Sequence, residues 1–159
     1  MAKQTVYVET SVLSFLCADP STVQKTFEKQ RDTVEWWGAY RQRFEAYVSD
    51  VVAAEAAMGH PTFAQRRLEK ADQLPLLTAE RDDRQLALEF VARGLIPRKA
   101  EVDGTHLAIA VRTGMDFLLT WNLKHLANPE TLPLVYNYLK AVGRHIPRIV
   151  TPAALLELM

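Results

Sequence analysis

This sequence lacks several features that mark common classes of protein, and each absence narrows the possible functions. Its 159 residues include a single cysteine, Cys17, which excludes an intrachain disulfide and the usual thiolate zinc sites. The six glycines occur singly, so no glycine-rich phosphate-binding loop is present. No apolar run approaches the roughly 18 residues that a membrane-spanning helix needs. We therefore expect no membrane association and a reducing location, the cytoplasm.

An excess of charge of one sign is also missing. Nineteen Lys and Arg residues balance nineteen Asp and Glu residues, and both halves of the chain are close to neutral. Bulk charge therefore gives no indication of nucleic-acid binding. Basic side chains that could line a path for RNA occur only in small clusters, which are more typical of solvated helix faces. These clusters are Arg41 and Arg43; Arg66, Arg67 and Lys70; Arg98 and Lys99; and Lys124.

The chain does contain an alternation of strand and helix signals, and residues 1–159 are expected to form one domain. Apolar and β-branched runs predict strands at 5–8, 47–48, 117–120 and 148–150, and a short edge strand at 74–77. Helical spacing and capping residues predict helices at 11–16, 23–44, 50–58, 63–71, 78–94, 102–112 and 130–142, and a last one from Pro152. This alternation predicts a three-layer α/β/α fold with a central, mainly parallel sheet of about four to five strands.

Polar residues follow the two strongest predicted strands. Glu9 comes directly after 5–8, and Asn122 comes two residues after 117–120. The carboxyl ends of parallel strands share one edge of the sheet, and ligands bind outside that edge. Functional groups are therefore expected there.

Two further carboxylates lie on helices next to this edge. Glu55 belongs to an otherwise small and apolar helix, and Asp103 lies in the first turn of another. If Glu9, Glu55 and Asp103 converge, their charges repel unless a cation lies between them. Oxygen ligands of this kind favour a hard divalent ion, Mg²⁺ or Mn²⁺. Asn122 could add an amide oxygen, or orient a water or a phosphate.

Four segments, in their order along the chain, resemble the PIN domain. They are YVETSVL (7–13), Ser49 with Glu55 six residues on, DGTHLAIA (103–110) and DFLLTWN (116–122). The likeness is greatest to the small VapC-type toxin nucleases and covers nearly the whole chain. It implies a metal-dependent endoribonuclease, the toxin of a toxin–antitoxin pair, which leaves 5′-phosphate and 3′-hydroxyl ends. It also implies an antitoxin partner and a homodimer.

The resemblance assigns Glu9, Glu55 and Asp103 as metal ligands, with Asn122 completing the catalytic set. Glu9 stands where the family commonly has Asp, and Asn122 where many members carry a fourth acid. The missing charge at Asn122 favours one ion rather than two. These departures also support an alternative, a weak or inactive PIN-fold protein that binds RNA or a partner protein. A phosphohydrolase acting on small nucleotides would instead need a closed pocket.

Other residues of the same segments are minor candidates. Thr10, Ser11 and Thr120 could contact substrate or orient the ligands, but their hydroxyls are equally suited to hydrogen bonds with local backbone. Asp116 is expected to be structural at the start of its strand. His106 is expected to be a helix residue with a satisfied ring rather than a base.

Trp36 and Trp37 raise a separate question. Neighbours on a helix point about 100° apart, so both are buried only if the helix is covered on two sides. One hypothesis is that one of them faces a partner chain, and the alternative is core packing.

Overall fold

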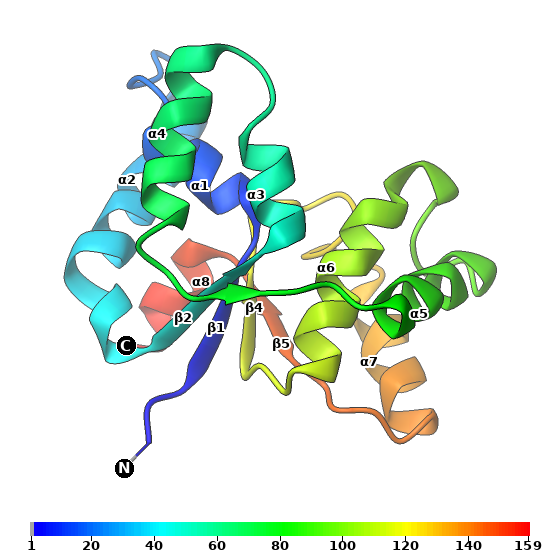
Figure 1. Cartoon of the computed structure of the whole chain (residues 1–159). Helices are drawn as coiled ribbons and strands as arrows, with labels where there is room; N and C mark the ends of the chain where they lie inside the picture. The colour runs from blue at the N-terminus through cyan, green and yellow to red at the C-terminus, as the bar shows by residue number, and fades with distance from the viewer. Residues whose placement is uncertain (1) are drawn as a thin grey trace.

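The computed structural model describes residues 2–159, and its centre is a sheet of five parallel strands in the order β3-β2-β1-β4-β5 (Figure 1). The strands are β1 (Thr5–Val8), β2 (Glu45–Ser49), β3 (Leu76–Leu77), β4 (Phe117–Leu119) and β5 (Arg148–Val150). All five predicted strands are present, and β3 lies at the edge, as Pro75 requires. The parallel order places the carboxyl ends of β2, β1 and β4 next to one another.

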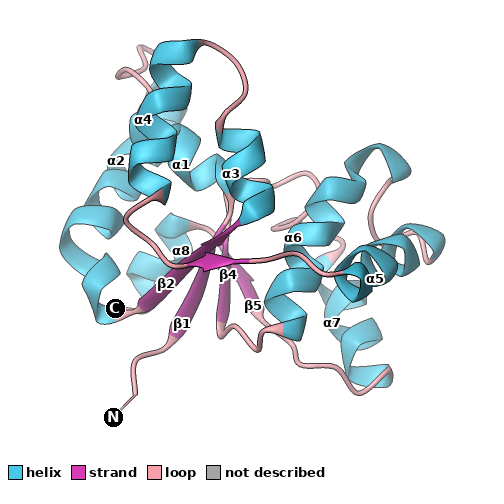
Figure 2. Ribbon diagram, in the orientation of Figure 1, coloured by secondary structure: helices cyan, strands magenta, loops and turns pink. Residues whose placement is uncertain are grey.

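Eight α-helices within residues 2–159 cover both faces of this sheet. They are α1 (Thr10–Cys17), α2 (Gln24–Glu35), α3 (Asp50–Ala56), α4 (Pro61–Ala71), α5 (Arg81–Ala92), α6 (Glu101–Arg112), α7 (Leu132–Ala141) and α8 (Pro152–Glu157). Helices α1, α2 and α8 lie on one side, and α5, α6 and α7 on the other (Figure 2). The three-layer α/β/α prediction is therefore confirmed. Among these residues, no helix is both long and apolar enough to cross a bilayer.

The capping residues explain most of the helix boundaries. Ser49 accepts a hydrogen bond from the backbone N–H of Val52 and starts α3, and Thr151 starts α8 in the same way, as the sequence predicts. The prediction that Thr78 begins α5 is wrong. That helix starts at Arg81, because Glu80 and Asp83 form a reciprocal capping box there.

The predicted helix 23–44 is interrupted. Helix α2 ends at Glu35, and a π-helical turn at Trp36–Tyr40 and a 3₁₀ turn at Arg41–Arg43 follow. Trp36 and Trp37 are only 0% and 7% exposed in the isolated chain. The hypothesis that one of them faces a partner chain is therefore wrong, and core packing is the explanation. The spacing of apolar residues could not reveal this π-helical turn. A wider turn changes the directions in which the side chains of Trp36 and Trp37 point.

Helix α6 is buried on nearly all sides, with every residue from Gly104 to Val111 buried. Its close packing on α5 depends on Gly104, since a Cβ there would lie 3.3 Å from the Cβ of Ala87. A helix enclosed in this way holds the side chains of its first two turns in fixed positions. These include Asp103 and His106.

The burial of Trp36 leads to a stability prediction. We expect Trp36→Ala to lower the free energy of unfolding by about 3–5 kcal/mol, because a large aromatic side chain leaves the core. Val34→Ala, at a site 53% exposed on the preceding turn, should change it by less than about 1 kcal/mol. Urea unfolding measures both. A change in solution mass at unchanged stability would instead place Trp36 between chains.

Candidate metal centre

Glu9 joins β1 to α1 and is 4% exposed. Its backbone N–H donates to the carbonyl of Leu119 in β4 at 3.0 Å, which fixes its position at the carboxyl edge of the sheet. Its side chain caps α1 by accepting from the backbone N–H of Ser11 at 3.0 Å. The hydroxyls of Ser11 and Thr120 both donate to its other oxygen, Oε1, at 2.5 Å. The start of α1 and the residue after β4 therefore both donate to this one buried carboxylate.

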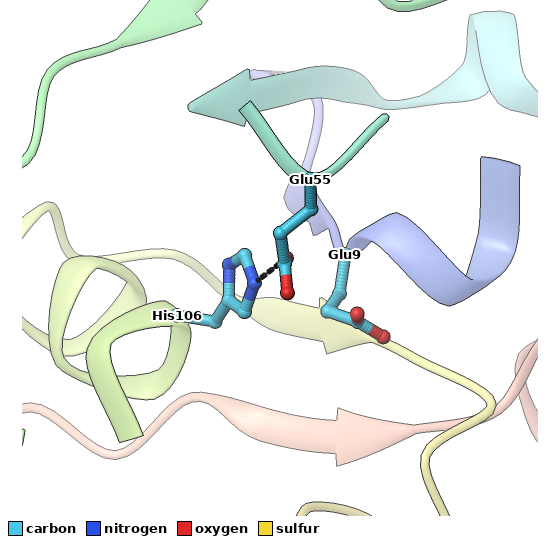
Figure 3. A group of neighbouring side chains, drawn as sticks. All are labelled: Glu9, Glu55 and His106. Carbon is cyan, nitrogen blue, oxygen red and sulfur yellow. Dashed lines mark hydrogen bonds and ion pairs between the residues drawn. The ribbon is translucent and has the colours of Figure 1, made fainter. Parts of the chain in front are cut away.

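Glu55 projects from α3 toward Glu9 (Figure 3). Its Oε1 accepts hydrogen bonds from Thr10 Oγ1 at 2.6 Å and from His106 Nε2 at 2.5 Å. Burial alone would raise the pKa of Glu55, but the hydrogen bond and the charge of His106 outweigh burial and lower it. The carboxylate form is thus favoured in the folded protein.

His106 is fully buried on α6, and both of its ring nitrogens are engaged. Nε2 meets Glu55, and Nδ1 lies 2.6 Å from the hydroxyl of Tyr7, which lies 2.7 Å from Ser49 Oγ. Burial lowers the pKa of His106, but the hydrogen bond with Glu55 and the nearby carboxylates of Glu9, Glu55 and Asp103 raise it overall. The expectation of a satisfied ring is confirmed.

Glu9, Glu55 and His106 each offer one ligand atom, and these three atoms lie within 4.8 Å of one another. The prediction that Glu9 and Glu55 come together thus agrees with the coordinates. The proximity of His106 was not foreseen. A signal for it exists in the sequence, because His106 follows Asp103 by three residues and shares its helix face.

Asp103 lies beside this group, in the first turn of α6, and is partly buried. Burial and the negative charge of Glu9 raise its pKa, while Asn122 and the histidines His106 and His125 oppose the rise. The negative charge of Glu9 therefore acts on the Asp103 carboxyl. Asp103 is nevertheless not one of the three residues whose ligand atoms lie within 4.8 Å of one another. The three predicted carboxylates share one region, with Asp103 at its margin.

Asn122 holds Asp103 rather than presenting an oxygen to the cluster. Its Oδ1 accepts from the backbone N–H of His125 at 2.9 Å, in the turn after β4. This leaves its amide N–H₂ to donate to Asp103, where it lowers the carboxyl pKa. The amide oxygen of Asn122 thus already accepts one hydrogen bond from the backbone.

The minor candidates divide into two groups. The hydroxyls of Thr10, Ser11 and Thr120 donate to the cluster carboxylates and fix their orientation. Asp116 lies at the opposite edge of the sheet, just before β4, where it accepts from the backbone N–H of Thr5 at 2.8 Å. It is a structural residue there, as expected from its position.

Several of the basic side chains have structural partners. Arg66 forms an ion pair with Asp19 at 3.0 Å, and Arg67 donates to the carbonyls of Ala56 and Met58 at the end of α3. Arg41 lies over the ring of Trp37. Exposed cations without such a role include Arg98, Lys99 and Lys124, the last of which follows Asn122 closely in the chain.

Two cavities of the described chain lie away from the cluster. A cavity of about 430 Å³ is bounded by α1 and α2, with Phe15, Phe27 and Val34 in its lining. A second, of about 380 Å³, lies against β2 and the segment before β3. Neither lining includes Glu9, Glu55 or Asp103. Neither cavity therefore provides the closed pocket at these acids that a small-nucleotide substrate would need.

No protein-family model and no curated protein matches the sequence of this chain. Solved structures do match its fold. The toxin VapC20 of Mycobacterium tuberculosis, described as cleaving the sarcin–ricin loop, aligns with a TM-score of 0.53 at 14% identity, over 71% of this chain and 86% of its own. VapBC2 of Rickettsia felis, bound to a DNA fragment from its promoter, aligns with a TM-score of 0.55 at 14% identity, over 93% and 98%.

The fold is thus that of the VapC-like PIN toxins. At 14% identity the likeness is one of backbone architecture, and the side chains of the site must be judged from this chain alone.

The raised pKa of Asp103 predicts a gain in stability on neutralisation. A raised folded-state pKa means that folding disfavours the carboxylate, so Asp103→Asn should raise the free energy of unfolding at pH 7 in a chelator. The difference should shrink as the pH falls through the folded-state pKa, where the wild-type carboxyl is protonated as well. Urea unfolding across pH measures this.

Glu101→Gln is the matched control, since it removes an exposed acid from the same first turn of α6. An equal response of the two variants would mean that the helix terminus, and not the neighbouring Glu9, sets the behaviour of Asp103.

Proposed function

We propose that this chain is a single-domain, metal-dependent endoribonuclease, the toxin of a toxin–antitoxin pair. The observation that carries the proposal is the meeting of Glu9 and Glu55 at the carboxyl edge of a VapC-like sheet, with Asp103 beside them. This edge is where open α/β sheets bind ligands. Residues 1–159 would form one PIN-like nuclease domain.

The donor set fits a hard divalent ion. Mg²⁺ is usually held by one or two carboxylates and keeps several waters, and Mn²⁺ accepts the same oxygen ligands. Both hydrogen bonds to Glu55 go to Oε1, so Oε2 has no hydrogen-bond partner among residues 2–159. Burial and the negative charge of Glu9 raise the pKa of Asp103. A cation bound between the two carboxylates would reduce their repulsion.

In this proposal Glu9, Glu55 and Asp103 would hold the ion, some of them through water. Asn122 keeps the Asp103 carboxyl in place. When bound, the ion makes its water easier to deprotonate and stabilises charge on a phosphate under attack. Thr10, Ser11 and Thr120 keep the carboxylates oriented during hydrolysis, which leaves 5′-phosphate and 3′-hydroxyl ends. The neutral Asn122 favours a single ion.

RNA is the proposed substrate, reaching the cluster from the exposed side of Glu55, whose side chain is 31% accessible. An antitoxin protein is the proposed partner, as the resemblance to the VapC-type toxins implies, and the fold match to VapBC2 supports this proposal. A homodimer in the cytoplasm completes the proposal.

Removal of the ligands should abolish cleavage. Glu55→Gln and Asp103→Asn should each lower the rate of RNA cleavage in Mn²⁺ by about a hundredfold or more, because each weakens charge stabilisation at the phosphate. Asp116→Asn, at the opposite edge, should retain activity. Cleavage of a labelled RNA, with folding checked by circular dichroism, provides the measurement. Full activity of Asp103→Asn would refute its assignment.

Binding of the ion should also stabilise the fold. At an ion concentration about 100 times the dissociation constant, the gain is about 2.7 kcal/mol. Thermal unfolding with and without Mg²⁺ should show this gain for the wild type and for Asp116→Asn, and little of it for Glu55→Gln. A wild-type protein that gains nothing from Mg²⁺ or Mn²⁺ would instead favour the alternative, a PIN-fold protein that binds without cutting.

A further inference from the structure

His106 is the one member of the tight cluster whose role the proposed chemistry leaves open. It is fully buried, and both ring nitrogens are within hydrogen-bond distance of other side chains. Either it is a ligand of the ion, or it acts on a neighbour that is.

We propose that Ser49, Tyr7 and His106 form a hydrogen-bonded chain that positions the Glu55 carboxylate, and that His106 is not itself a ligand. The consequence for catalysis rests on the proposed function, but the chain of contacts and its effect on ion binding do not require that RNA be the substrate.

The direction of the hydrogen bonds follows from the available protons. The Glu55 carboxylate can only accept, so His106 Nε2 carries the proton between them. With a neutral ring, Nδ1 accepts from the Tyr7 hydroxyl, and Tyr7 in turn accepts from Ser49; with a charged ring, Nδ1 donates to Tyr7, and Tyr7 donates to Ser49. In both cases the Nε2–H of His106 is directed at Glu55. Ser49 Oγ still accepts the backbone N–H of Val52. In either arrangement each of the three side-chain contacts pairs one donor with one acceptor, and Glu55 receives a proton donor from His106.

The elements that carry this chain are rigid. Tyr7 lies in the central strand β1 with hydrogen-bonded neighbours on both sides, and it is 0% exposed. Its ring packs edge-on against His106, with centroids 5.7 Å apart. His106 belongs to the enclosed part of α6.

The chain also begins and ends on the same short helix. Ser49 caps α3 at its first turn, and Glu55 lies one residue before its end. The path Ser49–Tyr7–His106–Glu55 thus ties both ends of α3 to β1 and α6. A glutamate on a seven-residue helix, half-exposed and with several rotatable bonds, would otherwise lose entropy on binding the ion.

A direct ligand role for His106 would break this arrangement. Binding through Nε2 would remove the proton that Glu55 accepts, and Nδ1 is occupied by Tyr7. Glu55, in contrast, is fixed through Oε1, and its Oε2 accepts no hydrogen bond from the residues that the structure describes, 2–159. This is the geometry of a ligand oriented by a neighbouring donor.

The first test compares two tyrosines that lie opposite each other in adjacent strands. Tyr7→Phe removes only the hydroxyl in the chain, whereas Tyr47→Phe removes a hydroxyl that has no hydrogen bond among residues 2–159. Mn²⁺ binding, followed by electron paramagnetic resonance without RNA, should be weaker by on the order of tenfold in Tyr7→Phe and unchanged in Tyr47→Phe. Equal affinity of the two variants would overturn the positioning role.

The second test separates positioning from ligation. In ¹⁵N-histidine-labelled protein, the Nε2–H signal of His106, assigned with His106→Gln, should persist when Mg²⁺ is added. Loss of this proton on binding would make His106 a ligand and overturn the proposal. His106→Gln, which keeps a donor toward Glu55, should bind Mn²⁺ more tightly than His106→Leu.

The outcomes distinguish this proposal from the proposed function. If the wild type binds no Mn²⁺, both fail together. If the wild type binds Mn²⁺ but Tyr7→Phe binds it equally well, only the positioning role fails.

Discussion

Negative charge gathered at one edge of a parallel sheet is the constraint on which this site depends. Carboxylates brought this close repel unless donors or cations compensate them. Glu9 and Glu55 are compensated by donors from the chain itself: Ser11, Thr120, Thr10 and His106. Asp103 is compensated less, and its pKa is raised. The folded chain thus compensates two of the carboxylates with its own donors, whereas burial and the charge of Glu9 raise the pKa of the third.

The strand order makes this convergence possible. Because β2, β1 and β4 are neighbours, α3, the start of α1 and Thr120 emerge side by side. Helix α6 brings Asp103 and His106 to the same edge from the opposite face of the sheet (Figure 1). A hydrogen bond such as that between Thr120 and Glu9 spans 111 residues of sequence, so the site exists only when the whole sheet is formed.

This dependence on tertiary structure explains what could be predicted from the sequence. The strands and most caps are local features, so Ser49, Pro75 and Thr151 predict their elements directly. The rule that ligands bind at the carboxyl edge of a parallel sheet predicts from the sequence alone that Glu9 and Glu55 lie at this edge. The role of His106 could not be predicted from the sequence, because its two hydrogen-bond partners, Tyr7 and Glu55, lie 99 and 51 residues away in the chain. The π-helical turn after Glu35 could not be predicted, because the apolar spacing of residues 23–44 also fits one continuous helix.

The two departures from the PIN pattern weigh less against catalysis than the sequence suggests. Glu9 has one methylene more than the Asp common at this position. Its carboxylate nevertheless caps α1 with Oε2 and receives the hydroxyls of Ser11 and Thr120 on Oε1. The extra length is thus absorbed within the helix start, and the charge remains at the sheet edge. Asn122 carries no charge, but its amide holds Asp103 while its oxygen closes the following turn. Each of the two residues thus keeps a contact or a charge effect within the acidic cluster, so neither departure by itself dismantles the cluster.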